Sequence, residues 1–114
     1  MKVASDEELS KLVLVMFREL GFVERFQLPH EELCHFVLAV AAGYRDNRYH
    51  NWRHAFSVAR TAFVIIREVQ LEKFLGEKEL LALFVAALCH DIDHRGRTSG
   101  QQFLQFFFFF DFFF

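Results

Sequence analysis

An apolar run over residues 80–89 ends directly in a segment that is rich in histidine and aspartate. Polar side chains at the end of a buried segment need partners, because an unpaired buried charge is energetically costly. A divalent metal ion would satisfy imidazoles and carboxylates together. The fold is therefore expected to build a metal site around His90, Asp91, Asp93 and His94.

A second cluster lies upstream, where His50 and His54 stand four positions apart. That spacing is one helical turn, so both imidazoles can face the same point. Imidazole and carboxylate groups are zinc ligands, and carboxylates also suit magnesium or manganese. His54, His90 and Asp91 can supply three ligands, and Asp91 can bridge to a second metal. His50 is then the candidate acid that protonates a leaving alkoxide, and the pattern predicts a metal-dependent phosphoester hydrolase.

Simpler interpretations of both clusters stay open at this point. Two histidines one turn apart are common on helices, and the metalloprotease pattern is not met, because Asn51 stands where that pattern has glutamate. Residues 90–94 could instead form an ion-pair cluster at a helix C-terminus, where histidine suits the helix dipole. Asn51 could simply cap a helix, and Trp52 could be a packing aromatic. Taken together, the two clusters favour the metal site.

Apolar residues recur at helical spacing, and no segment shows the alternation that marks a strand. Ser5 and Glu8 have the form of a capping box. Gly21 is a typical helix stop, and Pro29 suits the first turn of a helix. The predicted fold class is all-α, and the last helix is apolar on all sides, as in the middle of a larger bundle. The expected helices cover residues 5–21, 29–43, 50–69 and 77–89.

The apolar faces of the first three helices define the expected core. These faces are formed by Leu9, Leu12, Val13, Met16, Phe17, Leu20, Leu33, Phe36, Val37, Val40, Ala55, Val58, Ala59, Ala62, Ile65, Ile66 and Val69.

The composition is that of one small globular domain, with 114 residues of which 54% are hydrophobic and 25% charged. A net charge of -2 argues against nucleic acid and anionic membranes as partners. Cys34 and Cys89 are expected to be reduced, buried thiols, which suits a cytoplasmic location. No signal peptide is evident, and the apolar run of residues 80–89 is too short for a transmembrane segment.

Residues 100–114 form a low-complexity tail that is dominated by phenylalanine. The tail has neither a helical period nor turn chemistry, and we interpret it as unstructured or artefactual. The alternative is a segment that touches membranes or associates with itself. As a free segment it favours β-aggregation, because it is aromatic, nearly uncharged and free of proline.

Two stretches, residues 49–56 (YHNWRHAF) and 90–96 (HDIDHRG), resemble the catalytic-domain signatures of class I cyclic-nucleotide phosphodiesterases. Residues 16–23 (MFRELGFV) and 43–45 (GYR) resemble the cGMP-hydrolysing branch that carries regulatory GAF domains. The resemblance implies a partial helical bundle of that catalytic domain over residues 5–99. It also implies a hydrolase that opens a 3′,5′-cyclic nucleotide to the 5′-monophosphate with two metals, zinc and magnesium (or manganese).

The resemblance also implies roles for individual residues, matched position by position. The general acid is His50, and the residue that lines the nucleotide pocket is Tyr49. The positions that orient the ligands are Asn51, Asp93 and His94. The zinc ligands are His54, His90 and Asp91, the last of them shared with the second metal.

The chain also departs from the family pattern. Ser99 stands where the family has asparagine, and the similarity ends after Gly100. The family domain is much longer, and its later helices supply a further zinc-ligating aspartate and the glutamine that holds the purine. We therefore expect this chain alone to be inactive or nearly so, and a choice between cGMP and cAMP does not follow from it.

Three hypotheses follow from the sequence. The first is a cyclic-nucleotide phosphodiesterase that can form a homodimer through the full-length protein. The second is a truncated, non-catalytic chain that binds a full-length phosphodiesterase or a regulatory partner. The third is a His-Asp metal phosphohydrolase for nucleotides without a cyclic bond, against which residues 49–54 argue.

Overall fold

The computed structural model describes residues 3–44 and 50–92 of the chain. All regular elements in these two ranges are helices, which confirms the predicted all-α class. None of these helices is long and apolar enough to cross a membrane. The elements are α1 (Asp6–Glu19), α2 (Phe22–Arg25), α3 (His30–Gly43), α4 (Trp52–Glu68), the 3-10 helix η1 (Leu71–Lys73) and α5 (Glu77–Cys89).

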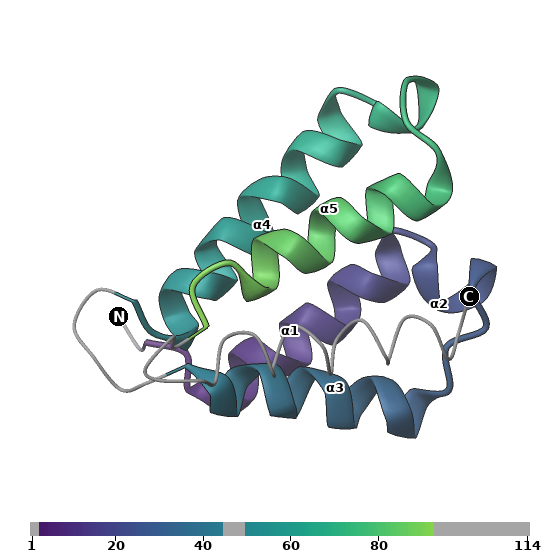
Figure 1. Cartoon of the computed structure of the whole chain (residues 1–114). Helices are drawn as coiled ribbons and strands as arrows, with labels where there is room; N and C mark the ends of the chain where they lie inside the picture. The colour runs from purple at the N-terminus through teal and green to yellow at the C-terminus, as the bar shows by residue number, and fades with distance from the viewer. Residues whose placement is uncertain (1–2, 45–49, 93–114) are drawn as a thin grey trace.

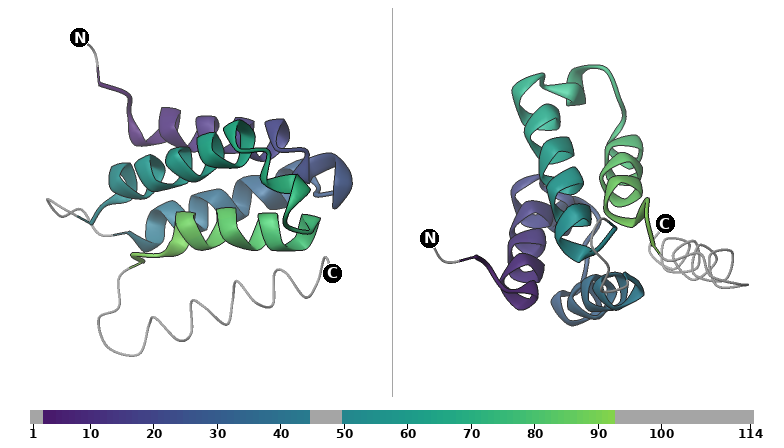
Figure 2. Two further views of the ribbon diagram at one scale, coloured as in Figure 1. Left: turned by 90° about the horizontal axis from the view of Figure 1, so that it is seen from above. Right: turned by 90° about the vertical axis from the view of Figure 1, so that its left-hand side faces the viewer.

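The helices form two pairs that pack on each other (Figure 1). Helices α4 and α5 are an antiparallel hairpin closed by η1, and α1 and α3 form the other pair. In the left-hand view of Figure 2 these four helices run in roughly one direction, whereas Figure 1 shows α4 steeply inclined to α3. Because the hairpin is antiparallel, it returns the end of α5 to the start of α4, where the predicted histidine clusters lie.

The helix ends follow local chemistry that the sequence largely predicts. The Ser5 hydroxyl accepts a hydrogen bond from Glu8 N–H (3.2 Å), as an N-cap should. Gly21 adopts φ 81°, a left-handed conformation that ends α1 without a steric penalty. Pro29 occupies the N-cap of α3 rather than its first turn. Residues 22–25, which were expected to be a plain connector, form the short helix α2.

The predicted start of the third helix at His50 is wrong by two residues, because α4 begins at Trp52. The reason is Asn51, whose extended backbone cannot continue a helix and whose side chain caps one instead. Asn51 Oδ1 accepts a hydrogen bond from His54 N–H (2.9 Å). His50 therefore precedes the helix, and His54 lies in its first turn.

Four phenylalanines from four helices form the centre of the core. Phe17 of α1 makes an edge-to-face contact with Phe84 of α5, with ring centroids 5.1 Å apart. Similar edge contacts join Phe17 to Phe22 of α2 (6.2 Å) and to Phe36 of α3 (6.5 Å). Aromatic pairs of this kind add about 0.5–1.5 kcal/mol beyond the area that they bury. This cluster ties α5 to the α1–α3 pair.

Several expected core positions are exposed within the described residues. Leu12 of α1 is 46% exposed, Ile65 of α4 is 47% exposed, and Val69, the C-cap of α4, is 54% exposed. Helix α5 is not covered on all sides: Leu83 is 40% exposed, and Ala82 and Ala86 beside it are exposed as well. A helical apolar stripe identifies a face that can be buried, whereas the neighbouring helices decide how much of it is covered.

Candidate metal centre

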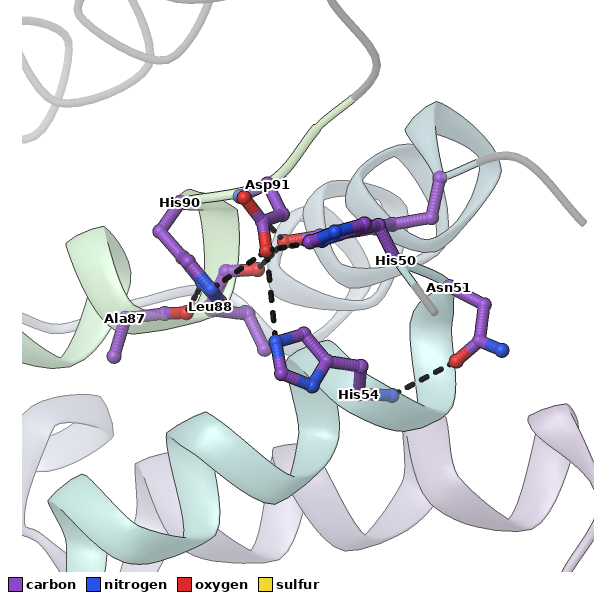
Figure 3. Close-up of polar contacts among 8 residues, drawn as sticks. His50, Asn51, His54, Ala87, Leu88, His90 and Asp91 are labelled. Atoms are coloured by element: carbon purple, nitrogen blue, oxygen red, sulfur yellow. Dashed lines mark hydrogen bonds and ion pairs between the residues drawn. The ribbon is translucent and has the colours of Figure 1, made fainter. Parts of the chain in front are cut away.

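The described residues of both predicted clusters meet at one end of the helical hairpin (Figure 3). His50 and His54 come from the start of α4, where the Asn51 cap sets the backbone. His90 and Asp91 follow α5 directly. The four side chains converge although the two pairs are far apart in the sequence, because the α4–α5 hairpin is antiparallel.

One carboxylate oxygen lies at the centre of this site. Asp91 Oδ2 is 2.9 Å from His50 Nδ1, 3.0 Å from His90 Nε2 and 3.5 Å from His54 Nε2. The hydrogen bond with His50, together with the charges of His90, His50 and His54, lowers the pKa of the Asp91 carboxyl against the opposing effect of partial burial. Asp91 is thus held as a carboxylate, the form in which it can bind a cation.

The site is open to solvent. The side chain of His50 is 62% exposed, and those of His54, His90 and Asp91 are 41%, 35% and 27% exposed.

The donor atoms lie close enough together to hold a metal ion. Nitrogen and oxygen ligands lie at about 2.0–2.2 Å from zinc in a tetrahedron, so neighbouring ligand atoms are about 3.3–3.6 Å apart. The contact of Asp91 Oδ2 with His54 (3.5 Å) lies in this range, whereas its contact with His90 (3.0 Å) is shorter and has the length of a hydrogen bond. Ligand atoms of His50, His54 and Asp91 also lie within 4.8 Å of one another. The described residues therefore contain a group that could hold a divalent metal.

A hydrogen bond fixes the orientation of His90. Its Nδ1 lies 2.8 Å from Ala87 O, and because a carbonyl oxygen only accepts, this nitrogen carries the proton. Nε2 is then the ring nitrogen left for a metal, and it lies 3.0 Å from Asp91 Oδ2. Histidines that bind metals usually donate their second nitrogen in this way.

Tyr44 makes a contact to the site that sequence reasoning missed. Its hydroxyl donates to Leu88 O (2.6 Å) and accepts from Asp91 N–H (3.3 Å). The side chain is buried, and burial raises the pKa of the phenol above its usual value. The available signal was a tyrosine at the end of an apolar helix, where a buried hydroxyl needs a polar partner.

The remaining predicted site residues divide into two groups. Asn51 acts here as the helix cap, because its side chain accepts a hydrogen bond from the backbone N–H of His54. Trp52 is 3% exposed, packs against the Tyr44 ring and donates Nε1–H to Asp6 O (3.4 Å), as a packing aromatic would. Tyr49, Asp93 and His94 lie outside the described residues.

Comparisons with known proteins agree on one family. The model of the 3′,5′-cyclic nucleotide phosphodiesterase family matches residues 49–104, the part that contains both clusters. The cGMP-specific 3′,5′-cyclic phosphodiesterases of Drosophila melanogaster and Drosophila erecta are 44% identical over 97 residues, which is 85% of this chain and 9% of each relative.

A solved structure extends the similarity to the fold. The phosphodiesterase domain of the RhoPDE fusion protein from the choanoflagellate Salpingoeca rosetta matches with a TM-score of 0.76 and 39% sequence identity. The match covers 81% of this chain and 29% of that structure. The chain thus spans less than a third of that structure and about a tenth of its fly relatives.

Proposed function

Because the chain belongs to the class I 3′,5′-cyclic nucleotide phosphodiesterase family, we propose that its histidine cluster is part of a site that hydrolyses cyclic nucleotides to 5′-monophosphates. The observation that carries this proposal is the convergence of His50, His54 and His90 on the carboxylate of Asp91. Among cyclic nucleotides we favour cGMP, since the fly relatives are described as cGMP-specific.

Three residues are proposed to hold zinc. His54 and His90 present Nε2, and Asp91 presents Oδ2, which could also be shared with a second ion such as magnesium or manganese. Bound divalent metals would supply positive charge that activates water and stabilises the phosphate in the transition state. The protein contributes the orientation of these ligands, through the Asn51 cap and the bond from His90 to Ala87 O.

His50 is proposed to donate the proton to the leaving 3′ oxygen. It precedes α4, and its side chain is the most exposed of the four, so a bound substrate can reach it. Its Nδ1 contacts Asp91, which orients the ring and can balance the charge of a protonated imidazole. A proton donor placed in this way typically contributes about 10²–10⁴-fold to the rate.

The assignments beyond the described residues complete this proposal. Tyr49 would line the nucleotide pocket, and Asp93 and His94 would orient the ligands. We propose that residues 5–99 form the part of the catalytic domain that this chain contains. The tail of residues 100–114 has no part in the proposed chemistry.

A chimaera tests the proposal directly. Residues 5–98 of this chain would replace the matching segment of the Drosophila melanogaster relative, and hydrolysis of cGMP would be measured with and without a chelator. We expect metal-dependent turnover, a loss of at least about 100-fold in His54→Ala, and a loss of about 10²–10⁴-fold in His50→Ala. Lys11→Ala, whose side chain is 70% exposed, is the matched surface control. A folded chimaera whose turnover survives both histidine substitutions would contradict the proposed site.

A non-catalytic role is the second candidate. It is favoured by the exposed apolar face of α5, formed by Ala82, Leu83 and Ala86. Such a face can bind a full-length phosphodiesterase or a regulatory partner. In that case the chain would act by association, with no need for a complete metal site.

A further inference from the structure

The turn after α5 carries two of the proposed ligands, His90 and Asp91. Hydrogen bonds to the last carbonyl groups of α5 stabilise this turn. An α-helix leaves its last carbonyl groups without intrahelical partners. At this end, Ala87 O accepts from His90 Nδ1–H (2.8 Å), and Leu88 O accepts from the hydroxyl of Tyr44 (2.6 Å). One of these partners is a proposed zinc ligand, whereas Tyr44 comes from the far end of α3.

The Tyr44 hydroxyl makes a second contact on the other side of His90. It accepts a hydrogen bond from the backbone N–H of Asp91 (3.3 Å). A single oxygen atom thus bridges the carbonyl of Leu88 and the amide of Asp91, the two backbone groups that flank the turn at His90. Its donor and its acceptor are both used, as expected for a buried tyrosine.

The ring of Tyr44 is buried and packs against another aromatic side chain. Tyr44 is 7% exposed, and its ring centroid lies 6.0 Å from that of Trp52, which is 3% exposed. Trp52 is the first residue of α4, between the Asn51 cap and His54. Tyr44 therefore contacts both halves of the site, through its hydroxyl at the end of α5 and through its ring at the start of α4.

On the basis of the metal site proposed above, we propose that Tyr44 is a positioning residue for zinc binding. Its hydroxyl holds the turn from Leu88 to Asp91 so that His90 and Asp91 face His54. Without the hydroxyl, a buried carbonyl and an amide lose their partner, and the turn must shift to recover hydrogen bonds. Groups that orient metal ligands typically change metal affinity by 10–100-fold when they are removed.

The test compares zinc binding by the unsubstituted chain, Tyr44→Phe and Val37→Ala. Tyr44→Phe keeps the ring and removes only the hydroxyl. Val37→Ala is the control for general loss of stability, because Val37 lies on α3, the helix that Tyr44 follows, is 1% exposed and has no polar side chain. Zinc affinity is measured by chelator competition, the ligand geometry by the visible absorption of bound Co²⁺, and helicity by circular dichroism. We expect Tyr44→Phe to weaken zinc binding at least about tenfold and to change the Co²⁺ spectrum, whereas Val37→Ala changes neither.

Each outcome decides the proposal. If the zinc affinity of Tyr44→Phe is within about twofold of that of the unsubstituted chain, and its Co²⁺ spectrum is the same, Tyr44 has no positioning role. That result would not contradict the proposed metal site. Failure of the unsubstituted chain to bind zinc would overturn the role of Tyr44 in this chain, whereas the proposed catalytic site is tested separately by the chimaera.

A second measurement covers the case in which Tyr44→Phe does not fold. The chain has only two tyrosines, so ¹³C labelling of the phenol carbon gives two signals, which Tyr49→Phe assigns. Zinc binding to the unsubstituted chain should shift the Tyr44 signal, because its hydroxyl contacts the ligand turn. A Tyr44 signal that zinc does not move would overturn the proposal.

Discussion

Cys89 directly precedes the proposed ligands His90 and Asp91, yet its thiol belongs to the core. It is 5% exposed, and burial raises the pKa of the thiol from 9.0 to about 12. Cys34 on α3 is only half-buried, so the prediction that both cysteines are buried holds for one of them. A thiol with a raised pKa stays protonated at neutral pH, so Cys89 is a poor metal ligand despite its position.

The raised pKa of Cys89 predicts a loss of stability at alkaline pH. The folded state holds this proton more tightly than the unfolded state, so the contribution to stability is complete below about pH 9. It is lost as the pH rises from 9.0 towards about 12. We expect the free energy of unfolding, measured by urea titration, to fall across this window and to fall less steeply in Cys89→Ala. Burial also raises the pKa of Tyr44, so the free energy of unfolding should fall less steeply with pH in Tyr44→Phe as well. Equal slopes in all three chains would contradict the prediction.

At the residue scale, the sequence predicted the site residues that can bind a metal, but not the tyrosine that contacts the site through backbone groups. His50, His54, His90 and Asp91 were predicted as one cluster, and the structure brings them together. Their roles as acid and ligands stay predictions. The contact of Tyr44 with the site was not predicted, because its partners are the backbone groups of Leu88 and Asp91, which a pattern of side chains does not single out.

At the scale of the element, the start of α4 determines where His54 points. Asn51 Oδ1 accepts from His54 N–H, so the cap and the proposed ligand share one hydrogen bond. We expect Asn51→Ala to lower the free energy of unfolding by about 1 kcal/mol and to weaken zinc binding, because the first turn of α4 loses its cap. Asn51→Ser, which keeps an acceptor, is the matched control and should preserve both values. A zinc affinity that is unchanged in Asn51→Ala would show that the cap serves stability alone.

The presence of the long helices was easier to predict than the residues at which helices begin and end. Helices α1 and α4 have clear apolar periods and α5 is a continuous apolar run, so the four long helices lie close to where they were expected. The four-residue helix α2 is too short for a period to show, and it depends on packing of Phe22 against Phe17 and Phe84. The spacing of His50 and His54 suggested an earlier start of α4, but the side chain of Asn51 caps the helix and α4 begins at Trp52.

At the scale of the whole molecule, the sequence shows which residues can be buried but not how many neighbours are present to bury them. Helix α5 is apolar on all sides, and within the described residues α4 and the α1–α3 pair cover only part of it. Leu81 is 1% exposed and Leu83 is 40% exposed, although they lie two positions apart on the same helix. The matched phosphodiesterase domain is more than three times as long as the part that this chain covers.

This matched pair of leucines yields a prediction about the α5 face. Leu81→Ala should lower the free energy of unfolding by about 2–5 kcal/mol, because it leaves a cavity in the core. Leu83→Asn should lower it by about 1 kcal/mol or less, because the side chain is already partly in water. Urea unfolding of both variants measures the difference. Equal losses would mean that another part of the chain covers α5.

The same Leu83→Asn variant tests the non-catalytic function. If the chain acts by binding a full-length phosphodiesterase through α5, this variant should be captured more weakly by the immobilised Drosophila melanogaster relative, while its helicity stays unchanged. Lys11→Ala, on the exposed face of α1, should be captured as well as the unsubstituted chain. Equal capture of all three chains would exclude the α5 face as the binding surface. Weak capture of Leu83→Asn alone would mean that the apolar side of α5, and not the metal site, carries the association.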